Sequence, residues 1–65
     1  MKELDLMLGE WLEQRWPYAE PGEREAFQWL LEQPDPVLAD WLLGGGRPAD
    51  ATHAMLVDEI IRLRA

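Results

Sequence analysis

The sequence predicts an all-α protein, a compact small bundle of four helices. Apolar residues recur at three- and four-residue spacing, which places them on one face of a helix, and no segment shows a credible strand pattern. Proline and glycine interrupt this periodicity at intervals short enough for neighbouring helices to pack directly. The 65 residues are 48% hydrophobic, with four tryptophans and no cysteine, so apolar packing must stabilise a single domain over residues 1–65.

The first helix is expected from about Lys2 to Arg15, and Pro17 ends it. Its apolar face is predicted to contain Leu4, Met7, Leu8, Trp11 and Leu12. Leu6 points away from this face. Gly9 lies inside the helical pattern, where glycine costs about 1 kcal/mol relative to alanine. We therefore expect this helix to rely on tertiary packing or on a close neighbour.

The second helix is expected to begin at Pro21, because backbone N–H groups of a first turn lack helical partners and proline has none to lose. It stops at Gln33-Pro34. Its buried face is predicted to contain Phe27, Leu30 and Leu31. Trp29 lies on roughly the opposite side, so Trp29 and Leu6 suggest a second apolar surface.

The third helix is expected to follow Asp35, which supplies an N-cap acceptor, with Pro36 in its first position. Its broad apolar face is predicted to contain Val37, Leu38, Trp41, Leu42 and Leu43. The segment Gly44-Gly45-Gly46 then ends the helix, because glycine readily adopts the left-handed conformation of a C-cap.

Asp50 is the predicted N-cap of the last helix. The residues expected to face inward on this helix are Ala54, Val57, Ile60 and Ile61. Arg62 and Arg64 lie near its C-terminus, where positive charge is favourable for the helix dipole.

The charge of the chain limits its partners. Thirteen acidic residues against six basic residues give a net charge of −7, which repels phosphate backbones and anionic lipid headgroups. We therefore expect no nucleic acid partner. No apolar run approaches the roughly 20 residues that span a bilayer, so we expect no membrane insertion. The absence of cysteine permits a reducing compartment, and a cytoplasmic location is predicted.

The sequence offers few groups for catalysis, since it contains no serine, no cysteine and only one histidine. Thr52 and His53 are consecutive and point about 100° apart on a helix, so they do not form a nucleophile–base pair. Asp58 and Glu59 are adjacent rather than one turn apart, which disfavours a metal site. Without a preceding strand, the three glycines do not form a phosphate loop. We expect a protein that is not an enzyme, with no catalytic, cofactor-binding or metal-binding residues.

A resemblance to a known family is carried by Asp35-Pro36, Trp41-Leu42 and then Gly46-Arg47-Pro48-Ala49-Asp50, in this order. Further positions fit the same register: Glu3-Leu4-Asp5, Tyr18, Glu23, Phe27, Leu30-Leu31-Glu32, Met55 and Val57. On these residues the chain resembles the succinate dehydrogenase assembly factor family over essentially its whole length.

This resemblance implies a helical protein that binds the flavoprotein subunit of succinate dehydrogenase or fumarate reductase and promotes covalent attachment of FAD. The FAD belongs to the client, and the assembly factor acts as a chaperone that favours a reactive conformation of the client. The alternative is an antitoxin-like soluble regulator, because relatives of this family are also described as partners of a small membrane toxin. A pull-down that names the partner discriminates between the two.

The family's binding signature is Arg-Gly-x-x-Glu, and Met1-Lys2-Glu3 occupies its last three positions. The resemblance therefore implies that Glu3 contacts the partner, together with its neighbours Met1, Lys2 and Asp5.

The family bundle has five helices, and its basic first helix and the Arg-Gly pair would precede the first residue of this chain. Either the sequence is truncated before Met1, or this member of the family has lost the helix. A lost helix would expose apolar surface, to which Leu6, Trp29 or the Met55-Leu56 pair would belong. Self-association through this surface follows as a prediction.

Overall fold

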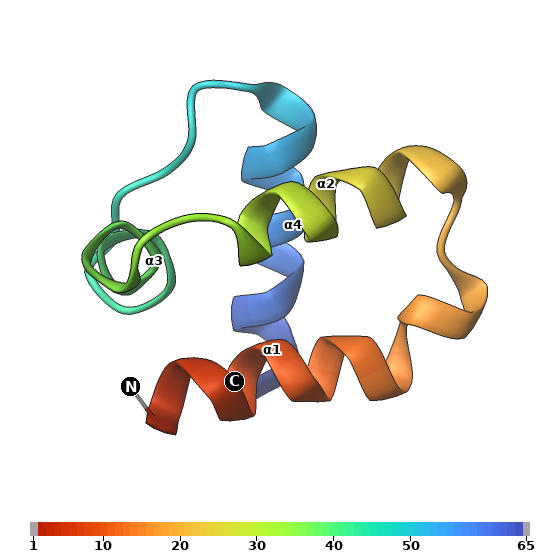
Figure 1. Cartoon of the computed structure of the whole chain (residues 1–65), viewed down its shortest axis with the longest axis horizontal. Coiled ribbons are helices and arrows are strands. Elements are labelled where there is room, and N and C mark those ends of the chain that lie inside the picture. The colour runs from red at the N-terminus through yellow and green to blue at the C-terminus, as the bar shows by residue number, and fades with distance from the viewer. Residues whose placement is uncertain (1, 65) are drawn as a thin grey trace.

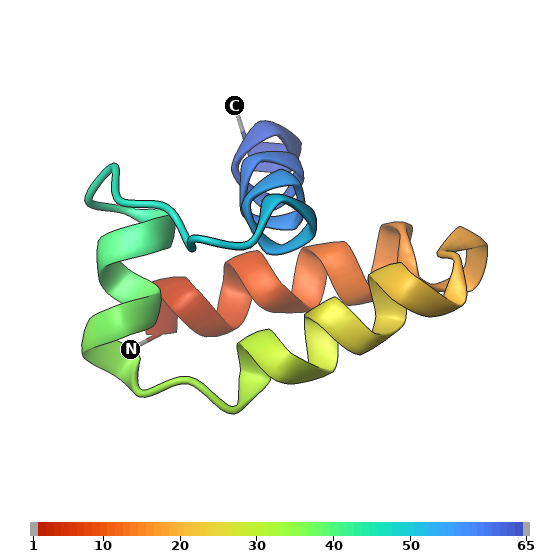
Figure 2. The ribbon, with the colours of Figure 1, turned by 90° about the horizontal axis from the view of Figure 1, so that it is seen from above.

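The computed structural model describes residues 2–64, and within this range the helices are joined by turns and short loops, without strands. Its elements are α1 (Lys2–Gln14), the short 3₁₀ helix η1 (Trp16–Tyr18), α2 (Pro21–Leu31), α3 (Asp35–Leu42) and α4 (Ala51–Arg64). α1 and α2 run in opposite directions, α4 crosses both, and α3 lies at the end where α1 begins (Figure 1, Figure 2). The predicted all-α fold with four helices is confirmed.

One hydrophobic cluster unites all four helices. It is formed by Leu4, Met7, Leu8, Trp11, Ala26, Phe27, Leu30, Leu38, Leu42, Leu56, Val57 and Ile60. At its centre the rings of Trp11 and Phe27 stack with their centroids 4.5 Å apart, and Trp16 contacts both rings edge-on. Because aromatic side chains bury large apolar areas, this trio holds α1, η1 and α2 together.

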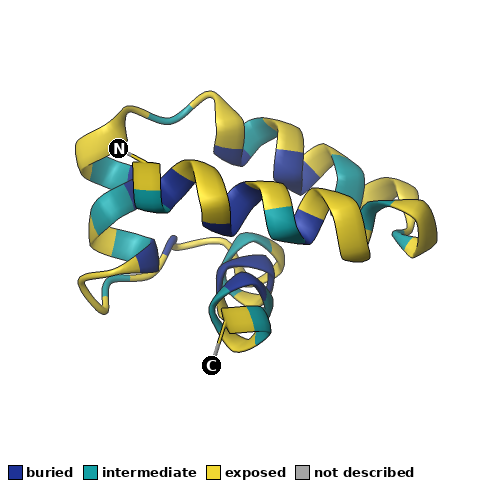
Figure 3. Cartoon of the chain, turned by 90° about the horizontal axis from the view of Figure 1, so that it is seen from below, coloured by how far each residue is buried: buried dark blue, intermediate teal, exposed yellow. Residues whose placement is uncertain are grey.

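Three leucines predicted to face the core are instead about half exposed: Leu12 at 48%, Leu31 at 51% and Leu43 at 48%. Each directly follows a residue that is buried, and one step along a helix turns a side chain by about 100°. A helix that packs on one side only buries a narrow stripe, so these residues fall outside it. Figure 3 shows buried stretches of ribbon, in dark blue, alternating with exposed ones along the helices. The predicted faces were therefore too wide.

The prediction for α4 also needs a correction. Leu56, which was expected to lie in an exposed pair with Met55, is buried at 6% exposure, whereas Met55 is 70% exposed. Ala54 and Ile61 were expected in the core but are only partly buried. α4 crosses two helices, so its buried face is turned toward Leu56 relative to the face that the periodicity indicated.

Trp29 is not the unpartnered residue that the sequence suggested. Its ring stacks on His53 of α4 with the centroids 3.8 Å apart, and on Trp41 of α3 with the centroids 5.5 Å apart. Helical periodicity within α2 could not reveal this stack, because both of its other rings come from helices that meet α2 only in the folded state.

Most helix ends follow the predicted signals. Pro21 opens α2, where Glu20 and Glu23 form a reciprocal capping box. The carboxylate of Asp50 accepts a hydrogen bond from the backbone N–H of His53 at 3.1 Å, which confirms the N-cap of α4. α3 begins one residue earlier than expected: the carbonyl of Pro34 accepts the first helical bond, so Asp35 lies in the first turn.

The turn after α3 is closed by backbone bonds. The N–H of Gly46 donates to the carbonyl of Asp40 at 2.9 Å, and Gly45 has a φ of +90°. This confirms the glycine stop, and it assigns the left-handed position to Gly45. None of the helices in the described range combines the length and apolarity that a membrane crossing requires.

Candidate functional site

The residues that the sequence singled out for partner contact lie in the first turn of α1. Lys2 and Asp5 are exposed and Glu3 is partly buried, while Met1 lies outside the described residues. Acidic side chains in a first turn are favourable near the positive end of the helix dipole. The helix therefore holds three charged side chains at one end of the molecule.

Glu3 is held in place by the last turn of α4. One guanidinium nitrogen of Arg64 contacts the carboxylate of Glu3 at 3.1 Å, and another contacts the carboxylate of Glu10 at 2.8 Å. Glu3 and Glu10 are two turns apart on α1, so they lie on the same side of the helix. The planar fork of an arginine suits such bridging, which fixes the Glu3 carboxylate relative to the fold.

Sequence reasoning did not identify Arg64 and Glu10 as part of this cluster. The spacing of Glu3 and Glu10 was a usable signal that two acids share a helix face. Arg64 was placed only by its favourable position near the end of α4, because nothing in the local sequence shows that α4 crosses α1 there. The crossing of α4 over α1 brings Arg64 to Glu3 and Glu10.

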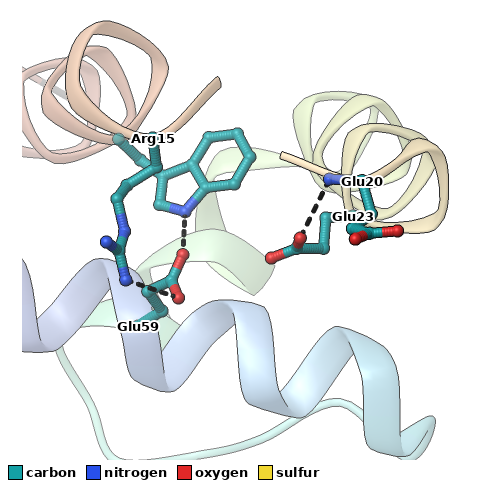
Figure 4. A network of polar contacts seen from close by, with 5 residues as sticks. Arg15, Glu20, Glu23 and Glu59 are labelled. Carbon is teal, nitrogen blue, oxygen red and sulfur yellow. Dashed lines mark hydrogen bonds and ion pairs between the residues drawn. The ribbon is translucent and has the colours of Figure 1, made fainter. Parts of the chain in front are cut away.

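A second polar network joins α4 to α1, next to the aromatic trio. The indole N–H of Trp11 donates to one carboxylate oxygen of Glu59 at 2.6 Å, and Arg15 donates to the other oxygen at 3.1 Å (Figure 4). Trp11 is fully buried, and Glu59 supplies the acceptor that its N–H needs.

Burial raises the pKa of Glu59, but hydrogen bonds from Trp11 and Arg15 and the positive charges of Arg15 and Arg62 outweigh it, so the pKa is lowered overall. Glu59 is therefore charged near neutral pH. Its neighbour Asp58 points elsewhere and binds Arg47 at 2.6 Å, which agrees with the separation expected for adjacent residues. The ion pair of Arg47 also helps to fix the turn that precedes α4.

The structure also places Thr52 and His53, which were considered as a nucleophile and a base. Thr52 is exposed, while the ring of His53 is stacked against Trp29. Across residues 2–64, no three histidine, cysteine or acidic side chains come close enough together to hold a metal ion. The charged cluster at the start of α1 is the candidate site that the sequence indicated.

Comparison with known proteins decides the family. The family described as "Flavinator of succinate dehydrogenase" matches residues 1–64. The chain belongs to this family. It is 38% identical over 63 residues to the FAD assembly factor SdhE of Coxiella burnetii, which covers 97% of the chain and 77% of that relative. The predicted family resemblance is confirmed.

Two further relatives carry the same name. The chain is 36% identical over 61 residues to the FAD assembly factors SdhE of Aliivibrio fischeri and Vibrio parahaemolyticus, in each case over 94% of the chain and 71% of the relative. No solved structure matches the chain. All three names describe FAD assembly factors.

Proposed function

We propose that this protein is an FAD assembly factor that binds the flavoprotein subunit of succinate dehydrogenase, or of fumarate reductase, and promotes covalent attachment of its FAD. The match of the flavinator family over residues 1–64 carries this proposal. The names of the curated relatives support it. No observation on this chain favours the antitoxin-like alternative.

The factor contributes binding energy rather than chemistry. If it binds the attachment-competent conformation of the flavoprotein more tightly than other conformations, it raises the population of that conformation. A preference of about 1.4 kcal/mol raises the ratio of the two populations tenfold. The FAD stays with the client throughout, and this chain holds no cofactor. The proposed location is the cytoplasm, a reducing compartment that suits a chain without cysteine.

The proposed contact surface is the first turn of α1 with Glu3 at its centre, flanked by Lys2 and Asp5. Arg64 positions the carboxylate of Glu3 while leaving it partly exposed, with 43% of the side chain accessible. Fixing the carboxylate before binding reduces the side-chain entropy that is lost on association. The surface is therefore preorganised for a partner that offers hydrogen-bond donors.

The test of the function is the covalent flavin content of the client in cells. Deleting the gene for this chain should lower the flavin fluorescence of the denatured flavoprotein subunit on a gel, and expressing the chain should restore it. Unchanged covalent flavin after deletion would refute the proposal. Purification of the chain with a small membrane toxin in place of the flavoprotein would favour the antitoxin-like function.

The role of Glu3 is tested by comparing Glu3→Gln with Glu10→Gln. Each variant removes one of the two ion pairs to Arg64, but only Glu3 belongs to the proposed contact surface. We expect Glu3→Gln to weaken binding of the flavoprotein clearly more than Glu10→Gln does, at similar thermal stability. Equal losses of affinity would show that the cluster only supports the fold.

A further inference from the structure

A groove lies between the first turns of α2 and the middle of α4. Its larger hollow has a volume of about 430 Å³. A smaller hollow of about 190 Å³ continues it toward η1, and both hollows are lined by Glu23 of α2 and Glu59 of α4. The larger volume lies in the range of sites that accept a ligand or the side chains of a partner. We name the two hollows together the α2–α4 groove.

The α2–α4 groove has an apolar floor and exposed apolar edges. Ala26 and Leu56 line the larger hollow and are buried. Met55 lines the same hollow and is 70% exposed, while Tyr18 lines the smaller hollow and is 86% exposed. These two are the most exposed of the large hydrophobic residues in the described range. Because neither side chain fills the core, both are available to a partner.

Three acidic side chains line the groove, and only two of them are neutralised within the chain. Those two form the ion pairs Glu59–Arg15 and Asp58–Arg47. The third, Glu23, accepts the backbone N–H of Glu20 at 3.0 Å, and no basic side chain of residues 2–64 pairs with it. Figure 4 shows its carboxylate directed into the space between α2 and α4. Glu23 is therefore the groove's unneutralised acid.

The groove also contains a basic side chain. Arg62 is exposed and lines the larger hollow, and it forms no ion pair with another described residue. Glu23 and Arg62 thus line one hollow without contacting each other. An acid from α2 and a base from α4 both face this hollow, and apolar residues separate them. This pattern fits a partner segment that carries apolar and charged side chains together.

We infer that the α2–α4 groove is a second docking site for the client flavoprotein, and that it takes a segment in which an apolar side chain stands next to a lysine or arginine. The apolar side chain packs against Ala26, Leu56 and Met55. The basic side chain pairs with Glu23, and a carbonyl or carboxylate of the segment accepts a hydrogen bond from Arg62. The inference rests on the proposed function and deepens it, because it names a further contact of the same partner.

The charge of the chain favours a basic client segment over a second copy. Two copies carry a net charge of −7 each, so they repel one another. Four of the six basic side chains are already bound to groups of their own chain: Arg15, Arg24, Arg47 and Arg64. A second copy could therefore offer Glu23 only Lys2 or Arg62.

The last turns of α4 connect the groove to the proposed contact surface. Arg64 contacts the carboxylate of Glu3 at 3.1 Å. Glu59 of the groove precedes Arg64 by five residues, which corresponds to about 8 Å along the helix axis. This separation is small compared with the width of a protein interface, so one client can contact both sites.

The charge is tested by comparing Glu23→Gln with Glu25→Gln. Glutamine keeps an acceptor oxygen for the N–H of Glu20, so the capping box and the fold are retained. Glu25 is a matched control, because it is an exposed acid of the same helix and does not line the groove. Glu23→Gln should weaken binding of the flavoprotein about tenfold in dilute buffer, and less in concentrated salt, which screens exposed charges. Glu25→Gln should bind like the unmodified chain.

The apolar contact is tested by comparing Met55→Ala with Leu31→Ala. Leu31 is a control from the end of α2, where it is 51% exposed and does not line the groove. Alanine is a strong helix former, so both variants should keep the circular dichroism of the unmodified chain. Met55→Ala should weaken binding about tenfold, whereas Leu31→Ala should leave it unchanged.

Calorimetric titration of the flavoprotein subunit, purified without covalent FAD, measures these affinities. The inference requires a loss of affinity from both Glu23→Gln and Met55→Ala. If the unmodified chain binds but either of these variants binds as tightly as its control, the inference is wrong and the proposed function stands. If the unmodified chain does not bind at all, the proposed function fails and the inference fails with it.

Two further outcomes would overturn the inference. A loss from Glu23→Gln that is equally large in concentrated salt would show that the charge of Glu23 does not act on a basic side chain. Sedimentation that shows a dimer broken by Met55→Ala would identify a second copy as the occupant of the groove.

Discussion

Replacing Glu59 by alanine tests how much the polar network beneath the aromatic trio stabilises the protein. The change removes the acceptor of the Trp11 indole N–H, a hydrogen bond of 2.6 Å, together with the partner of Arg15 at 3.1 Å. Trp11 is fully buried, whereas the side chain of Glu59 is 22% exposed. Without Glu59 the indole N–H loses its acceptor within the protein.

A buried donor without an acceptor costs about 1–3 kcal/mol, and the lost bond is strengthened by the negative charge of Glu59. We expect Glu59→Ala to lower the free energy of unfolding by about 2–3 kcal/mol. In a domain of this size that corresponds to roughly 10–20 °C in melting temperature. Glu59→Gln keeps an acceptor oxygen and loses only the charge, so it should cost about 1 kcal/mol.

Urea unfolding monitored by tryptophan fluorescence measures these differences. Asp58→Ala is the control, because it removes the neighbouring acid, whose ion pair with Arg47 is exposed and should contribute at most about 1 kcal/mol. Should Glu59→Ala cost no more than Asp58→Ala, the bond to Trp11 would not stabilise the fold as argued.

The lowered pKa of Glu59 determines how the stability difference between the native chain and Glu59→Gln depends on pH. The Glu59 carboxylate binds a proton less readily in the folded state than in the unfolded state, so its charge stabilises the fold above the ordinary pKa of 4.5. It is lost as the pH falls through the folded-state pKa. The stability difference between the native chain and Glu59→Gln should therefore narrow below pH 4.5 and stay constant near neutral pH.

Three further changes probe the fold. Asp50→Ala removes the N-cap bond to the N–H of His53 and should cost about 1 kcal/mol in chemical unfolding, whereas Asp50→Asn should cost little; equal costs would contradict the capping role. Gly45→Ala forces an alanine to a φ of +90° and should cost about 1 kcal/mol or more, visible as a lower melting temperature; an unchanged value would argue against the left-handed turn. Phe27→Ala empties the centre of the core and should cost about 3–5 kcal/mol, enough to remove most helical circular dichroism from so small a domain; a native spectrum at 25 °C would show that the core repacks around the gap.

Local signals were sufficient to predict the helices and several of their ends. Asp50 and Pro21 act through bonds within one turn of their own positions, so their roles can be derived from a few neighbouring residues. The residues most central to the core, such as Leu4 and Trp11, also follow from periodicity, because they lie in the middle of an apolar face.

Periodicity does not show on which side of a helix its neighbour packs. Leu12 and Leu31 lie at the margins of the apolar faces of α1 and α2, and only the packing of α4 and α1 decides which margin of each face is buried. The same holds for the site: the sequence drew attention to Glu3 through a family signature, but the contact with Arg64 depends on how α4 crosses α1. Whether Glu3 meets a partner stays a prediction.

The ion pair between Glu3 and Arg64 links the first described turn of the chain to the last. Contacts between residues so distant in sequence form late, because the intervening chain must first be ordered before loop closure becomes favourable. The carboxylate of Glu3 is therefore held in its final orientation only after α4 has docked across α1. A client that recognises this orientation would bind a completely folded factor in preference to a partly folded one. The factor would therefore have to complete its folding before it acts on the client.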